Sequence, residues 1–187
     1  MISVAPRFSL LARALVISGY VLIVEWSRVL LMRTPGLALP ALALGGAALL
    51  LVAWGWPAER LGLGRSRLVF RLLGGFALGA VLLLPAAVRP GAAPILPAGL
   101  ALAAVAVSIG EEVAFRGALY AALEEVGGAP VAVLGSTLLW TLAHALSHPP
   151  EFLGAVAAAG LLLALWRWAC KDLVAPVIAH VIADVTL

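Results

Sequence analysis

Long apolar stretches separated by short breaks run along the chain. They cover residues 9–31, 37–56, 68–88, 98–123, 130–147, 152–170 and 173–187. Proline and glycine mark the breaks, for example TPG at residues 34–36, RPG at 89–91, GGAP at 127–130 and HPP at 148–150. Because a membrane-spanning helix needs about 20 mainly apolar residues, the pattern predicts an all-α, polytopic transmembrane helix bundle of about seven spans.

The composition agrees with a membrane protein and leaves no room for a separate soluble domain. Of the 187 residues, 64% are hydrophobic and 11% are charged, whereas soluble domains carry about 25% charged residues. We therefore expect a single integral-membrane domain over residues 1–187. The apolar runs are continuous, which disfavours outer-membrane β-strands because those alternate between polar and apolar residues.

The basic residues lie mainly between the apolar runs and favour one side of the predicted bundle. The formal net charge of +3 therefore indicates membrane topology rather than a nucleic-acid partner. Eight basic residues fall on the N-terminal side, namely Arg7, Arg13, Arg60, Arg65, Arg67, Arg71, Arg167 and Lys171. Three fall on the opposite side, namely Arg28, Arg33 and Arg89. Because cytoplasmic loops are enriched in Lys and Arg, we expect a membrane protein with a cytoplasmic N-terminus.

Six ionisable residues fall deep inside the apolar runs. Each costs about 2.5 to 3.5 kcal/mol at bilayer depth, so each is a candidate functional residue. They are Glu111, Glu112, Arg116, His144, His180 and Asp184. At about 1.5 Å per residue, Glu111, His144 and Asp184 come out at similar depths in three different helices. The sequence therefore predicts one polar layer among the helices at 98–123, 130–147 and 173–187.

Helical spacing indicates different roles for the two adjacent glutamates. Glu112 and Arg116 are one turn apart and roughly 40° apart around an α-helix, so we expect them to pair. This pairing leaves Glu111 as the less compensated carboxyl, suited to proton transfer near neutrality. The alternative is a purely structural Glu-Arg pair that locks two helices.

Two further pairs of residues share the i, i+4 spacing of one helix face. His180 and Asp184 can orient each other or point at one ligand, and His148 follows His144 but lies at a helix end before two prolines. These residue types with a glutamate would also suit zinc, although the chain has no HExxH motif. The spacing of Glu25 and Arg28 indicates a local pair near a span end.

Three short motifs resemble those of a known family. EEVAFR at residues 111–116 resembles the EExxxR motif of the CPBP family, the CAAX proteases and bacteriocin-processing enzymes also called Abi. STLLWTLAH at residues 136–144 is similar to the family's FxxxH motif, with Trp140 in place of Phe. HVIAD at residues 180–184 is similar to the HxxxN/D motif, with Asp184 as the last residue. The resemblance covers residues 60–187.

This resemblance implies an intramembrane glutamic-type endopeptidase that needs no cofactor. Glu111 would be the general base and His144 its partner, while Glu112 would be a supporting carboxylate tied to Arg116. His180 and Asp184 would complete the oxyanion side. Because this reaction needs water inside the bundle, we expect a polar cavity among the helices at 98–123, 130–147 and 173–187. An ionised Asp184 would repel an oxyanion unless it is protonated or turned toward His180.

The resemblance implies a membrane-anchored or lipid-modified peptide tail, held in the lipid bilayer, as the substrate. The short chain fits the family's bacterial members better than its eukaryotic ones, so we expect it in the bacterial inner membrane. Three alternatives use the same residues differently. The first is a non-catalytic immunity or scaffold protein, and the second is a zinc-dependent membrane hydrolase. The third is a proton- or ion-coupled carrier, which is disfavoured because the chain shows no inverted repeat.

Overall fold

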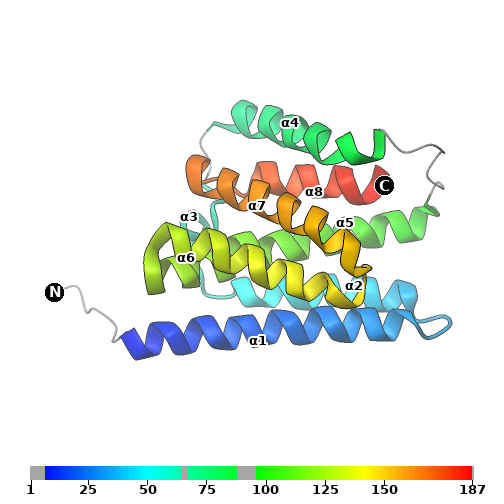
Figure 1. Ribbon diagram of the computed structural model, residues 1–187, viewed down its shortest axis with the longest axis horizontal. Helices are drawn as coiled ribbons and strands as arrows, with labels where there is room; N and C mark the ends of the chain where they lie inside the picture. The colour runs from blue at the N-terminus through cyan, green and yellow to red at the C-terminus, as the bar shows by residue number, and fades with distance from the viewer. Residues whose placement is uncertain (1–6, 65–66, 88–95, 187) are drawn as a thin grey trace.

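The computed structural model describes residues 7–64, 67–87 and 96–186, and all regular structure within them is helical (Figure 1). The first four helices are α1 (Arg7–Met32), α2 (Ala38–Leu50, continued by a 3₁₀ turn η1 over Leu51–Ala53), α3 (Ala58–Leu61) and α4 (Leu68–Ala87). Then follow α5 (Ala98–Glu112), a π-helical segment η2 (Val113–Leu119) and α6 (Tyr120–Ala143). The 3₁₀ turns η3 (His144–Leu146) and η4 (Pro150–Phe152) precede α7 (Leu153–Cys170) and α8 (Val174–Thr186).

The predicted all-α membrane bundle is confirmed. Three helical stretches are long and apolar enough to cross a membrane, namely Ser9–Met32, Ala98–Leu146 and Pro150–Cys170. Shorter apolar helices cover Ala38–Ala53, Leu68–Leu84 and Val174–Thr186. Together they account for about seven spans, because the stretch Ala98–Leu146 reverses once and holds two. The predicted break at residues 89–91 and the predicted segment ends at 88 and 187 lie outside the described residues.

The reversal occurs at the GGAP motif. Gly127 (φ −147°, ψ 21°) and Gly128 (φ 71°, ψ −169°) leave helical geometry inside α6, and the positive φ of Gly128 lies in the region that favours glycine. Figure 1 shows the later part of α6 returning toward the side of the bundle from which α5 started. The motif therefore separates the helix that carries Glu111 from the one that carries His144.

Glycines let the inner helices approach closely. A Cβ atom on Gly46 of α2 would lie 2.7 Å from the backbone oxygen of Ala106 in α5, and one on Gly110 would lie 2.5 Å from the oxygen of Gly46. Likewise Gly75 of α4 lies against Ile178 of α8. These small residues bring whole backbones into contact, as is typical of helix packing in membranes.

The outer faces of the helices are apolar. Large side chains there remain well exposed, including Leu44 (70%), Leu102 (73%) and Leu134 (64%). An apolar exterior around a polar centre is the arrangement expected of a helix bundle embedded in a lipid bilayer.

We predict that Gly46→Ala destabilises the protein. The new methyl group would meet the α5 backbone, which cannot move aside as a flexible side chain could, so we expect the free energy of unfolding to fall by about 1–3 kcal/mol. Thermal unfolding of the detergent-solubilised protein measures this loss. Gly19→Ala in α1 is the control, because a Cβ atom there has nothing within 4 Å. Equal behaviour of the two variants would contradict the packing account.

Candidate active site

The structure brings the six predicted residues together at the centre of the bundle. Glu111 and Glu112 end α5, Arg116 lies in η2, His144 begins η3, and His180 and Asp184 lie on α8. Both glutamates and the arginine are at most 2% exposed. One charged cluster is therefore assembled from three separate segments of the chain.

Glu112 is held by two partners in the driest part of the cluster. Its Oε1 accepts a hydrogen bond from Arg116 Nη1 at 2.9 Å, which confirms the predicted pairing, and lies 3.0 Å from His180 Nδ1. Arg116 also donates to the backbone oxygen of Gly160 at 3.3 Å. Its guanidinium lies 3.5 Å from the ring centroid of Trp140. These contacts compensate a charge pair that is removed from solvent.

Glu111 has one oxygen bound and one oxygen free of hydrogen bonds. Oε1 accepts a hydrogen bond from Arg28 Nη2 at 2.8 Å. Oε2 lies 3.7 Å from His144 Nε2 and 3.9 Å from His180 Nε2. Among the described residues this buried Oε2 has no hydrogen-bond partner. Glu111 Oε2 therefore faces two imidazole nitrogens, at distances that one bridging water molecule could span.

The ring of His144 is oriented by Trp140. Its Nδ1 lies 2.9 Å from the backbone oxygen of Trp140, and because a carbonyl can only accept, Nδ1 carries the proton. In the neutral ring Nε2 is then an acceptor, and it is the nitrogen that faces Glu111. The imidazole also stacks on the Trp140 indole, with centroids 4.7 Å apart and planes 5° apart.

Asp184 is turned toward His180 at the more open end of the cluster. Its Oδ2 lies 3.4 Å from His180 Nε2 and accepts a hydrogen bond from Ser108 Oγ at 2.8 Å. The Asp184 side chain is 36% exposed, in contrast to 8% for His180. Thus both ring nitrogens of His180 face carboxylates, and Asp184 marks the side from which the cluster can be reached.

A family model described as type II CAAX prenyl endopeptidase, Rce1-like, matches residues 93–186. This match covers half of the chain and contains all six residues. The chain belongs to the Rce1-like CAAX prenyl endopeptidase family. No curated protein and no solved structure matches it. It is accordingly an integral membrane protein of a protease family.

Two residues outside the Rce1-like match also enter the cluster, a contact that their predicted role as a local pair near a span end did not include. Glu25 and Arg28 do pair with each other. Their side chains are only 1% and 10% exposed, and Arg28 also binds Glu111 of α5. They lie inside the apolar run 9–31, so the criterion that selected the six residues could have selected them too. Ser108, one turn before Glu111, was also missed.

His148 lies beside the Rce1-like cluster rather than within it. Its ring lies between those of His144 (5.4 Å) and Phe152 (5.2 Å), and its Nδ1 is 2.9 Å from Ser147 Oγ. Partial burial lowers the pKa of His148 from its usual value. Within the part of the chain that the structure describes, no three His, Cys, Asp or Glu side chains form a group suited to a metal ion.

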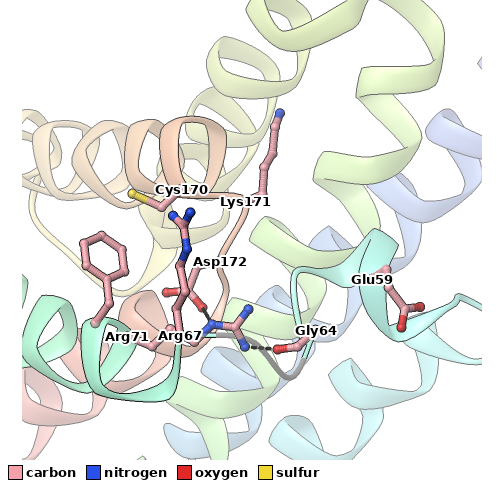
Figure 2. A pocket seen from close by; sticks show the side chains of 8 residues that line it. Glu59, Gly64, Arg67, Arg71, Cys170, Lys171 and Asp172 are labelled. Atoms are coloured by element: carbon pink, nitrogen blue, oxygen red, sulfur yellow. Dashed lines mark hydrogen bonds and ion pairs between the residues drawn. The ribbon is translucent and has the colours of Figure 1, made fainter.

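A second buried charge pair fixes the start of α8, which carries His180. The Asp172 side chain is buried, with 2% of its surface exposed. It accepts hydrogen bonds from the backbone nitrogens of Val174 and Ala175 at 3.0 and 3.1 Å. Its Oδ1 also lies 3.2 Å from Arg71 Nε. Figure 2 shows Arg71 between Asp172 and Gly64. A carboxylate at a helix N-terminus is stabilising, and this one anchors α8 to α4.

Two cavities among the described residues lie away from the cluster centre, so neither is the polar cavity expected among the three helices. One, of about 320 Å³, borders Asp172 and Arg71 (Figure 2). The other, of about 420 Å³, is an apolar groove between α1 and α2 with Arg28 and Gly45 in its lining. The groove therefore approaches the arginine that binds Glu111, from the outside of the bundle.

We predict that Arg116→Met strongly destabilises the fold. The change would leave Glu112 buried with its principal charge partner gone, at a cost of about 3–5 kcal/mol in the free energy of unfolding. Lys171→Met is the control, since its pair with Glu124 is 3.4 Å long and the lysine side chain is 62% exposed, which limits the loss to about 1 kcal/mol. Thermal unfolding in detergent compares the two; similar losses would contradict the buried-pair account.

Proposed function

We propose that this protein is an intramembrane endopeptidase that cleaves membrane-anchored or lipid-modified peptide tails with a water molecule activated by Glu111 and His144. The observation that supports it is the free Oε2 of Glu111, which lies 3.7 Å from the acceptor nitrogen of His144. Two acceptors that face each other need a donor between them, and one water molecule can donate to both. Membership of a CAAX protease family supports the same reaction class.

The proposed reaction is a general-base attack without a covalent intermediate. The water oxygen attacks the carbonyl carbon of the scissile peptide bond while its proton passes to the Glu111–His144 pair. The resulting tetrahedral intermediate collapses when the C–N bond breaks. The same pair returns the proton to the leaving amine nitrogen, and the new carboxyl group loses the second water proton to solvent, so the products are a carboxylate and an amine.

His180 is the proposed electrostatic partner of the oxyanion. Its two ring nitrogens face Glu112 and Asp184, an arrangement suited to the doubly protonated ring. With Asp184 turned toward His180 and held by Ser108, the carboxylate orients the imidazole instead of facing the substrate. A positive group in a dry site stabilises developing negative charge far better than it does in water.

The groove between α1 and α2 supports a substrate that carries a lipid chain. Its lining is mainly apolar, it holds about 420 Å³, and it approaches the cluster at Arg28. A flexible hydrocarbon chain in this groove would bring the attached peptide close to Glu111.

We propose that the side of the bundle on which α1 begins faces the cytoplasm of a bacterial inner membrane. Arg71 and Arg167 are buried and hold helices together, so they do not count as interfacial charges. The exposed basic residues that the structure describes still favour the same side. Arg13, Arg60, Arg67 and Lys171 lie on the side where α1 begins, and Arg33 lies on the opposite side. Excess Lys and Arg mark cytoplasmic ends.

We predict that Glu111→Gln and His144→Ala each abolish cleavage of a membrane-anchored peptide in detergent or in vesicles, because the Gln amide is not basic and Ala has no imidazole to take the water proton. Each variant is expected to remain assembled, as judged by its elution in size-exclusion chromatography. The matched controls are Glu151→Gln and His148→Ala, which change residues outside the cluster. Full cleavage by either Glu111→Gln or His144→Ala would refute the assignment.

A second prediction concerns the groove. Ser27→Trp places a bulky side chain in its lining, so cleavage of an S-isoprenylated peptide should fall much more than cleavage of the same peptide without the lipid. Leu102→Trp is the control, because Leu102 lies on the outer face of α5 and is 73% exposed. An equal effect of Ser27→Trp on the two peptides would exclude the groove as the site of the lipid chain.

A further inference from the structure

Helix α1 contributes an arginine to the site from a part of the chain that the family match does not include. Arg28 Nη2 donates to Glu111 Oε1 at 2.8 Å across 83 residues of sequence, and the same nitrogen binds Glu25 one turn earlier on α1. We propose that Arg28, held by Glu25, is a positioning residue that fixes Oε1 of Glu111 and thereby makes Oε2 the reacting oxygen. This inference rests on the proposed function.

The geometry gives Arg28 a directional role. A terminal guanidinium nitrogen has two hydrogens that lie in one plane, so Nη2 can donate one to each carboxylate. With Oε1 held, the Glu111 carboxylate cannot turn freely, and Oε2 stays between His144 Nε2 and His180 Nε2 at 3.7 and 3.9 Å. A carboxylate held in one orientation keeps its attacking water in line with the scissile carbonyl.

Burial indicates that this contact is specific. The side chains of Glu25, Arg28 and Glu111 are 1%, 10% and 3% exposed, and a buried charged triad contributes no more stability than a well-packed apolar contact of the same size. Charged residues deep in a membrane protein are accordingly functional candidates.

Helix α2 makes room for the arginine. A Cβ atom on Gly45 would lie 2.6 Å from Cδ and 3.1 Å from Cγ of Arg28, which is too close for the side chain to stay in place. Gly45 therefore supplies a way to displace the guanidinium without changing Arg28 itself.

The first experiment measures kcat and KM for Arg28→Met, Arg28→Lys and wild type on one membrane-anchored peptide, with thermal unfolding recorded for each. For Arg28→Met we expect kcat to fall about 100-fold with KM unchanged, the loss typical of a reacting group misplaced by about 1 Å. Arg28→Lys should recover part of kcat because it keeps the charge but lacks the planar head. Wild-type kcat in folded Arg28→Met would overturn the inference, as would a rise in KM alone.

The second experiment covers the case in which Arg28→Met does not fold. Gly45→Ala should lower kcat in the same way, while Gly19→Ala, whose Cβ atom has nothing within 4 Å, should not. Equal kcat for these two variants would overturn the inference. If wild type cleaves and Glu111→Gln does not, the proposed function stands whatever the Arg28 variants show. An inactive wild type would overturn both.

Discussion

A charged side chain inside an apolar bundle must be paired, and this constraint organises the centre of the molecule. Glu112 is paired with Arg116, Glu111 with Arg28, and His180 lies between Glu112 and Asp184. The Glu111–Arg28 and Glu112–His180 contacts join different helices, so these charges also determine which helices face one another. Three buried carboxylate oxygens of the cluster still have no hydrogen-bond partner among the described residues, namely Glu25 Oε1, Glu111 Oε2 and Glu112 Oε2. Oε2 of Glu111 lies 3.7 Å from His144 Nε2 and 3.9 Å from His180 Nε2, so it is an unpaired oxygen beside two groups that can exchange a proton.

The surrounding helices hold this cluster through contacts that leave little freedom. Gly46 and Gly110 bring α2 and α5 into backbone contact, and this contact holds α5, which carries Glu111, against the helix that lines the groove near Arg28. Asp172 ties the beginning of α8 to Arg71 of α4, and His180 follows two turns later. The orientation of each reacting group is therefore set by rigid elements rather than by loops, as a site that must place atoms within about 0.5 Å requires.

Much of this arrangement could be predicted from the sequence, because local spacing carries it. The apolar runs predict the helices, the GGAP motif predicts the reversal at Gly127 and Gly128, and the i, i+4 spacing predicts the Glu112–Arg116 pair. Arg28 could not be placed in this way, because spacing along α1 does not tell which other helix that face of α1 meets. The π-helical turn over Val113–Leu119 was missed for a similar reason, since it depends on packing around buried side chains rather than on an apolar period.

The most direct test of the account is cleavage of a prenylated, membrane-anchored peptide by wild-type protein after treatment with a chelator, with the metal content of the same sample measured. We expect cleavage to persist and no stoichiometric metal to be present, because Glu111 and His144 together supply the acceptors that the water needs. Stoichiometric zinc in the purified protein, with cleavage lost on chelation and restored by added zinc, would contradict it and would reassign the same side chains as metal ligands.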